Sequence, residues 1–210
     1  MSEPAILYDK PECPFCWRVR MALHRCGVEV ERRPYDRWEH EWRALTPQAT
    51  VPVLRMEGRV LTDSSQMLDA LDDRFGGLWP ASPQRRAWAR DLAQYADGEV
   101  GRAVRDIVFQ RRERAPSQWD ESVIAAALRT WHEALPHLEE ALGEREYFVD
   151  GAGITDFVLA SRFGLAMAYG MPATRLPALA AWFGRISGSA AFLTTAPPVV
   201  IDTLQRGWQS

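Results

Sequence analysis

Short apolar runs alternate with polar and turn-forming residues along the first 80 positions of the chain. Four runs have the length and composition of strands, at residues 5–8, 28–33, 51–56 and 59–61. Glu57 and Gly58 separate the last two runs, which predicts a β-hairpin with a tight turn. Between the first two runs, apolar residues recur at helical spacing before Gly27, at Phe15, Val19, Ala22, Leu23 and Cys26. The pattern predicts a mixed α/β unit.

A second helix is predicted after the hairpin. Its apolar face consists of Met67, Leu68, Leu71 and Phe75. Asp63 or Ser64 is suited to cap its start, and the glycines at 76 and 77 end it. The next residues combine breakers with no periodicity, which is typical of a linker. We therefore predict an α/β domain at residues 1–77, a linker at 78–83 and a second domain at 84–210.

The chain beyond the linker has helical periodicity over most of its length. The stretches at 84–114, 117–142, 153–170 and 174–187 are predicted helices, and no strand-like alternation interrupts them. Leucines and one tryptophan form a stripe of spacing three or four that is typical of packed helices: Leu128, Trp131, Leu135, Leu138 and Leu142. The expected fold class is an α/β N-terminal domain followed by an all-α C-terminal domain.

Composition indicates an ordinary globular protein, with 47% apolar and 25% charged residues among 210. The net charge of -3 gives no overall reason to expect nucleic acid or an anionic membrane as a partner. Basic residues at 111–114 are mixed with acid in a helical stretch, so we interpret them as a solvated helix face. With three cysteines, no signal-peptide pattern and no membrane-spanning apolar run, we expect a cytoplasmic location.

The cluster Cys13-Pro14-Phe15-Cys16 carries the clearest chemical signal. If Pro14 takes the first helical position, Cys13 becomes the N-cap and its sulfur faces the positive end of the helix. Such a position lowers a cysteine pKa from about 8.5 to roughly 3.5–7.5, which makes a nucleophilic thiolate available. Cys16 lies one turn deeper beside the apolar face, where it suits a shielded resolving thiol.

A zinc site is the main structural alternative for two cysteines at this spacing, with His24 and Cys26 as further ligands. In one continuous helix, these residues lie about 12–20 Å along the axis from the motif cysteines. Zinc ligand bonds are near 2.3 Å, so we predict no metal site. Cys26 is interpreted as a small buried apolar residue.

Taken together, the strand, the cysteine cap, the helix, the second strand and Val51-Pro52 before a hairpin resemble the thioredoxin-like fold of glutaredoxins. With an all-helical remainder, the whole chain resembles a cytosolic glutathione transferase of the cysteine type. It is similar to omega-class, dehydroascorbate-reductase-like and two-domain glutaredoxin-like members. The resemblance implies glutathione as co-substrate and a homodimer.

The resemblance also implies a set of glutathione-binding residues. Pro52 would be cis, and the backbone of Val51 would pair with the cysteinyl part of glutathione. Asp63 and Ser64 match the acidic-Ser pair that holds the γ-glutamyl end, a role compatible with helix capping. Phe15, within the cysteine motif, completes this set.

Two segments depart from the family pattern. Residues 45–50 lack its usual Asn-Pro and glycine, so no residue is assigned to the glycyl carboxylate of glutathione. In the helical domain, relatives carry Ser or Thr three residues before a buried Asp, as a capping box. Here Asp156 is preceded at that spacing by Gly153, so the capping device is altered.

Three aromatic residues are further candidates for the site. Tyr8 alternates with Ile6 and is interpreted as a core residue, because Cys13 occupies the position expected for the catalytic group. Trp17 points away from the apolar stripe of its predicted helix, and it is expected either to line the pocket of the second substrate or to be an exposed or interdomain aromatic. Tyr95 is a weaker candidate for the same pocket.

Three functions from different classes fit these residues. Retention of both thiols favours a redox enzyme, in which Cys13 performs glutathione-dependent thiol transfer or reduction of a disulfide substrate. The second is a transferase that conjugates glutathione to a small electrophile. The third is a binding or regulatory protein that keeps the fold without catalysis.

Overall fold

Four strands form one mixed sheet in the N-terminal part of the computed structural model, which describes residues 4–46, 48 and 50–207. They are β1 (Ala5–Asp9), β2 (Val30–Pro34), β3 (Val53–Met56) and β4 (Arg59–Leu61), in the order β2-β1-β3-β4. β2 runs parallel to β1, while β3 and β4 are antiparallel to their neighbours. Glu57 and Gly58 both have positive φ in the predicted hairpin turn.

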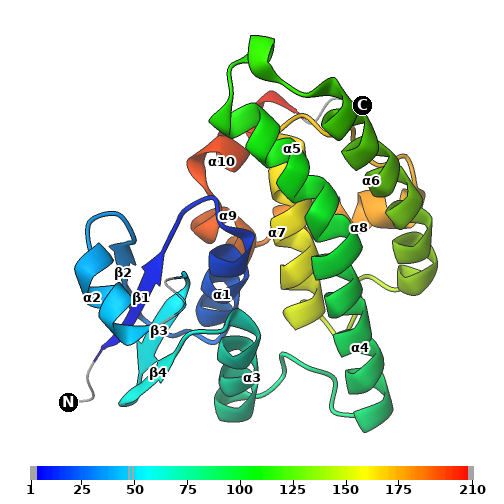
Figure 1. Ribbon diagram of the computed structural model, residues 1–210. Helices are drawn as coiled ribbons and strands as arrows, with labels where there is room; N and C mark the ends of the chain where they lie inside the picture. The colour runs from blue at the N-terminus through cyan, green and yellow to red at the C-terminus, as the bar shows by residue number, and fades with distance from the viewer. Residues whose placement is uncertain (1–3, 47, 49, 208–210) are drawn as a thin grey trace.

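Three helices cover this sheet (Figure 1): α1 (Pro14–Arg25), α2 (Glu39–Leu45) and α3 (Ser64–Phe75). Because side chains alternate along a strand, Leu7 and Leu54 join the large core that contains α1 and α3. Ile6 and Tyr8 instead form a small second core with Trp42 of α2. α2 has no counterpart in the sequence prediction, since Trp42 is its one buried residue and no apolar stripe repeats.

The remainder of the described chain is helical, apart from an isolated bridge between Val149 and Gly151. Its α-helices are α4 (Pro83–Tyr95), α5 (Gly101–Glu113), α6 (Glu121–Leu142), α7 (Ile154–Ala168), α8 (Pro177–Ser187), α9 (Ala190–Thr195) and α10 (Pro198–Arg206). A π-helical turn, Ala96–Val100, joins α4 to α5, so the predicted stretch at 84–114 is one helical path with a wider turn inside it. This architecture confirms the expected fold class.

Helix α7 lies at the centre of the molecule and packs against α1, α4, α5, α8 and α10 (Figure 1). Every residue from its start to Met167 is buried, which explains why its sequence is mostly apolar. A single core cluster runs from Leu7 in the sheet to Val200 in α10. The proposed linker joins this core through the buried Leu78 and Trp79. Among the described residues, no helix has the length and apolarity needed to cross a membrane.

Candidate functional site

Cys13 lies at the N-cap of α1, where the sequence places it. Its backbone is extended, with φ −88° and ψ 118°, and Pro14 begins the helix. The first helical hydrogen bond runs from the Trp17 N–H to the Cys13 carbonyl at 2.9 Å, so the missing N–H of Pro14 costs nothing. Cys13 as a residue is half-buried, and it lines a cleft.

The surroundings of Cys13 lower its pKa to about 6. The largest cause is hydrogen bonding by the Cys16 thiol to the Cys13 sulfur, and burial acts in the opposite direction. The backbone N–H groups of Cys16 and Phe15 contribute further, although the sulfur makes no regular N-cap hydrogen bond. The positive charge of Arg162 adds to the effect. At neutral pH, Cys13 is therefore largely a thiolate.

Cys16 is the buried partner of this pair. Its sulfur accepts a hydrogen bond from the Lys10 backbone N–H at 3.4 Å. Burial, together with the hydrogen bond and negative charge of Cys13, raises the pKa of Cys16 well above its ordinary value. The lowered pKa suits Cys13 to act as the nucleophile, and the raised pKa suits Cys16 to donate a hydrogen bond to it.

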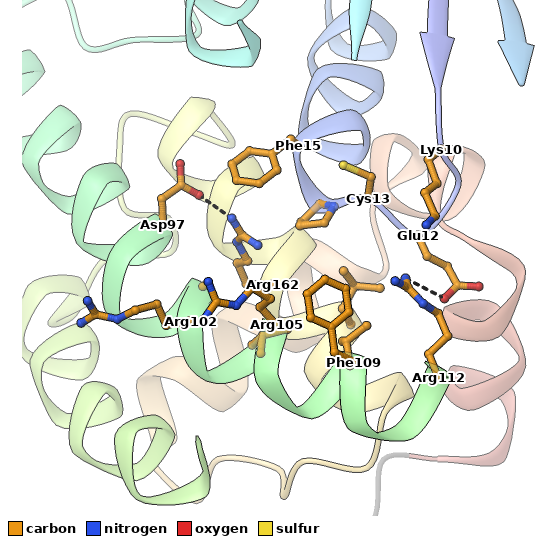
Figure 2. Close-up of a pocket in the computed structure, with 15 residues that line it drawn as sticks. Lys10, Glu12, Cys13, Phe15, Asp97, Arg102, Arg105, Phe109, Arg112 and Arg162 are labelled. Atoms are coloured by element: carbon orange, nitrogen blue, oxygen red, sulfur yellow. Dashed lines mark hydrogen bonds and ion pairs between the residues drawn. The ribbon is translucent and has the colours of Figure 1, made fainter. Parts of the chain in front are cut away.

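Phe15, at the start of α1, contacts two arginines, of which Figure 2 shows Arg162. The guanidinium carbons of Arg18 and Arg162 lie 4.8 and 4.7 Å from its ring centroid. Asp97, in the π-helical turn, binds Arg18 at 2.5 Å and Arg162 at 2.9 Å. Figure 2 draws the second of these ion pairs. This clamp fixes the cysteine motif against the helical part of the chain.

The other residues implied by the resemblance lie near the same end of the sheet. The Val51-Pro52 bond is cis, as expected. Because Tyr8 pairs with Val53, the antiparallel register brings Val51 to the end of β1, where the chain turns toward Cys13. In the segment at residues 45–50, positions 47 and 49 lie outside the described residues.

The pair Asp63 and Ser64 begins helix α3. Asp63 is exposed and caps the helix by accepting the Gln66 N–H at 2.9 Å. Ser64 is buried, and its hydroxyl accepts a hydrogen bond from Arg18 at 2.7 Å. Arg18 therefore connects the start of α3 with α1 and, through Asp97, with the helical part.

A cleft of about 350 Å³ opens beside Cys13, between the start of α1 and helices α5 and α7 (Figure 2). Its apolar wall includes Phe15, Val104, Val108, Phe109 and Leu165. Its charged lining is mostly basic: Lys10, Arg102, Arg105, Arg112 and Arg162, against Glu12 and Asp97. The thiolate thus faces a space large enough for a small second reactant.

Residues 7–86 match the family model described as "Glutathione S-transferase, N-terminal domain". The maleylacetoacetate isomerase of Rhizobium meliloti (strain 1021) is 30% identical over 151 residues, which cover 65% of this chain and 71% of that protein. The chain belongs to the glutathione S-transferase superfamily. A probable glutathione S-transferase, GSTU1, of Oryza sativa subsp. indica is 33% identical over 159 residues, covering 70% of this chain and 66% of that one.

Solved structures of glutathione S-transferases share the fold over nearly the whole chain. The theta class enzyme of Xanthomonas axonopodis pv. citri, with glutathione bound, has a TM-score of 0.81 at 22% identity. That alignment covers 93% of this chain and 98% of the Xanthomonas chain. Membership of the cysteine-type group within this superfamily stays a prediction from the Cys13 motif.

Trp17 corrects one prediction. Trp17 is fully buried and absent from the lining of the cleft, so it does not line the pocket expected for the second substrate. It is instead an aromatic residue packed between α1 and the helical part of the chain, which was the alternative. Its indole N–H donates to the Thr195 hydroxyl at 3.1 Å, and its ring lies 4.8 Å from that of Phe192. Helices α7 and α9 pack on this side of α1, so α1 is covered on two faces instead of one.

Tyr95 also lies apart from the cleft. It is half-buried, and its ring packs at 4.5 Å from His137 of α6. Tyr8, by contrast, is a core residue as predicted, with its hydroxyl donating to Glu41 at 2.6 Å. Burial and the hydrogen bond to Glu41 raise the pKa of the Tyr8 phenol.

Sequence reasoning missed the basic wall of the cleft. Arg112 belongs to the cluster that was interpreted as a solvated face, yet its side chain is only 20% exposed and lines the cleft. Arg162 and Asp97 carried no signal of their own, because each is a single charged residue in a helical stretch. The spacing of Arg102, Arg105 and Arg112 along one face of α5 was the available signal.

Proposed function

We propose that this member of the glutathione S-transferase superfamily is a glutathione-dependent thiol oxidoreductase that acts through Cys13. The observation that carries the proposal is the Cys13 sulfur at the N-cap of α1, with a pKa of about 6, at the mouth of the cleft. Solved relatives described as having glutathione bound support the choice of co-substrate.

In this proposal, glutathione lies along the edge formed by Val51, Phe15 and the start of α3. The backbone of Val51 pairs with its cysteinyl unit, and Asp63 and Ser64 hold its γ-glutamyl end. Arg18 supports this placement, because it holds the buried Ser64 hydroxyl beside the exposed Asp63 carboxylate. The glutathione sulfur then faces Cys13.

The reaction proceeds by thiol–disulfide exchange. The Cys13 thiolate attacks the glutathione sulfur of a mixed disulfide, so that a Cys13–glutathione bond forms and the substrate sulfur leaves as a thiolate, which takes a proton from water. A second glutathione thiolate attacks this intermediate, releases oxidised glutathione and regenerates the Cys13 thiolate. Because burial disfavours the thiolate of Cys16, free glutathione is favoured over Cys16 for the second step.

Conjugation is the second candidate. The apolar wall of the cleft and the name of the rice relative, a probable glutathione S-transferase, support it. In that reaction the thiolate of glutathione attacks an electrophile, and the leaving group departs while Cys13 forms no bond.

The decisive experiment compares the wild type with Cys13→Ser and Cys16→Ser. Each is assayed for reduction of a small glutathione mixed disulfide and for conjugation of an aryl halide, with Cys26→Ser as a control outside the cleft. We expect Cys13→Ser to lose disulfide reduction by at least a hundredfold and Cys16→Ser to retain most of it. Unchanged reduction in Cys13→Ser would refute the proposal. Retained conjugation alone would favour the second candidate, and failure to bind millimolar glutathione would indicate a non-catalytic binding protein.

A further inference from the structure

One face of helix α5 presents a repeated basic and aromatic pattern to the cleft. Arg102, Arg105, Phe109 and Arg112 follow each other at spacings of three, four and three residues, which places them on the same side of a helix. Arg105 and Arg112 lie on either side of Phe109 along α5 in Figure 2. Phe109 is 50% exposed, so its ring is accessible from the cleft that it lines.

Both acids that line the cleft are paired with arginine. Asp97 is shared between the guanidinium groups of Arg18 and Arg162, so this group of three carries a net positive charge beside Phe15. Glu12 accepts a hydrogen bond from the Tyr169 hydroxyl and lies 3.7 Å from Arg112. Both carboxylates are therefore engaged within the protein, and Asp97 is outnumbered by its two arginines.

Lys10 and Arg105 have the most capacity for a new anionic partner. Among the residues that the structure describes, Arg105 binds only the neighbouring Asp106, at 2.9 Å through Nε and Nη2, and its side chain is 56% exposed. The Lys10 ammonium lies over the Tyr35 ring at 5.3 Å, with no ion pair to a described residue. Lys10 is also the only lysine of the chain. Arg112 is less available to a new anionic partner, because it binds Glu113 at 2.6 Å.

From this arrangement we propose that the second substrate is an aromatic compound bearing a carboxylate or a similar anionic group. Its ring packs on Phe109 and Val108, and its anion is bound by Arg105 with Lys10 and Arg112 nearby. This inference rests on the proposed function, since the leaving thiolate of the exchange reaction must depart into the same cleft. It adds a charge requirement that neither Cys13 nor the glutathione-binding residues impose.

The test uses two glutathione mixed disulfides that differ only in charge, one with 4-mercaptobenzoate and one with 4-mercaptobenzamide. After correction for the uncatalysed reaction with glutathione, we expect kcat/KM to be about tenfold higher for the benzoate, as one charge-assisted hydrogen bond provides. In Arg105→Gln, the ratio of kcat/KM for the benzoate to kcat/KM for the benzamide falls toward one. Arg206→Gln, which changes an exposed arginine of α10 outside the cleft, leaves the ratio unchanged.

A binding measurement separates this inference from the proposed function. Lys10 carries the only lysine ε-amino group, so its acylation can be followed by mass spectrometry without turnover. We expect 4-(methylthio)benzoate, which cannot exchange thiols, to protect Lys10 more strongly than 4-(methylthio)benzamide. Equal protection by both compounds, or turnover without preference for the benzoate, would overturn the inference. Protection by the benzoate with turnover of neither disulfide would instead defeat the proposed function and leave the anion site standing.

Discussion

Cys13 owes its acidity to groups from its own helical turn and to one arginine that is distant in sequence. The Cys16 thiol and the N–H groups of Phe15 and Cys16 are supplied by the next three residues. Arg162 reaches the site from α7, where its buried side chain is held by Asp97. The local groups were visible in the sequence, whereas Arg162 reaches Cys13 only through the packing of α7 against α1.

Alkylation kinetics test this acidity directly. In a Cys26→Ser background, the rate of reaction of Cys13 with iodoacetamide should follow the thiolate fraction, with a midpoint near pH 6. Below that pH, the rate should fall about tenfold for each unit, because protonation removes the nucleophile. Peptide mapping by mass spectrometry assigns the modified residue. A midpoint near 8.5, the ordinary value, would contradict the assigned environment.

Variants of Cys16 extend the same measurement. Cys16→Ala removes the hydrogen-bond donor that most lowers the Cys13 pKa, so the midpoint should move upward by about one unit. Cys16→Ser keeps an O–H donor at this position and serves as the matched control, with a smaller shift. Midpoints equal to the wild-type value in both variants would show that the helix terminus and Arg162 account for the acidity without Cys16.

At the scale of elements, the start of α7 explains the altered capping device. Asp156 is buried and accepts hydrogen bonds from Trp182 at 2.9 Å, Phe148 at 3.0 Å and Gly153 at 3.2 Å. Burial raises its pKa to about 6, and the three N–H donors oppose this shift. Half of the capping box therefore remains, because Asp156 still binds the N–H of the cap residue.

Glycine is required at the cap because the backbone of another segment passes against it. A Cβ on Gly153 would lie 2.5 Å from both the Leu78 carbonyl oxygen and a methyl group of Val149. Gly153→Ser should thus destabilise the protein by about 2 kcal/mol, although it restores the residue usual in relatives. Urea unfolding followed by circular dichroism measures this change. Gly184→Ala, on an exposed position of α8 with nothing within 4 Å, is the control and should be neutral or stabilising.

At the scale of the whole molecule, α1 belongs to both parts of the chain. It packs on the sheet through the core that contains Leu7, and on α7 and α9 through Trp17. The approach to α7 is close, because a Cβ on Gly164 would lie 2.5 and 2.7 Å from two carbons of the Trp17 ring. A shared core of this kind favours unfolding of both parts in one transition.

Gly164→Ala should therefore weaken the whole protein. Overpacking against Trp17 is expected to cost about 1–3 kcal/mol and to lower the urea midpoint of the single transition. In a Trp17→Phe background the opposing ring is smaller. Gly164→Ala should therefore lower the free energy of unfolding by less than it does beside tryptophan. If the two parts unfold in separate transitions in the wild type, the shared core does not couple them. The homodimer implied by the family also remains a prediction about the whole molecule.

Much of the fold was predictable because its signals are local. The strand runs, the hairpin at Glu57 and Gly58, and the long helices follow from spacings within a dozen residues. Helix α2 was missed because a single tryptophan, Trp42, anchors it to the sheet. The π-helical turn was missed as well, since the apolar pattern continues through it.

By itself, the sequence determined the thioredoxin-like start of the chain, the helical remainder and the position of Cys13 before Pro14 at a helix N-terminus. A helix cap depends on a few adjacent residues, so it can be predicted from the sequence alone. Only the tertiary structure decided that Trp17 is buried and that Arg162 reaches Cys13. It also decided that the basic face of α5 lines the cleft. Those contacts join segments far apart in sequence, and which side of a helix becomes covered depends on the helices that pack against it.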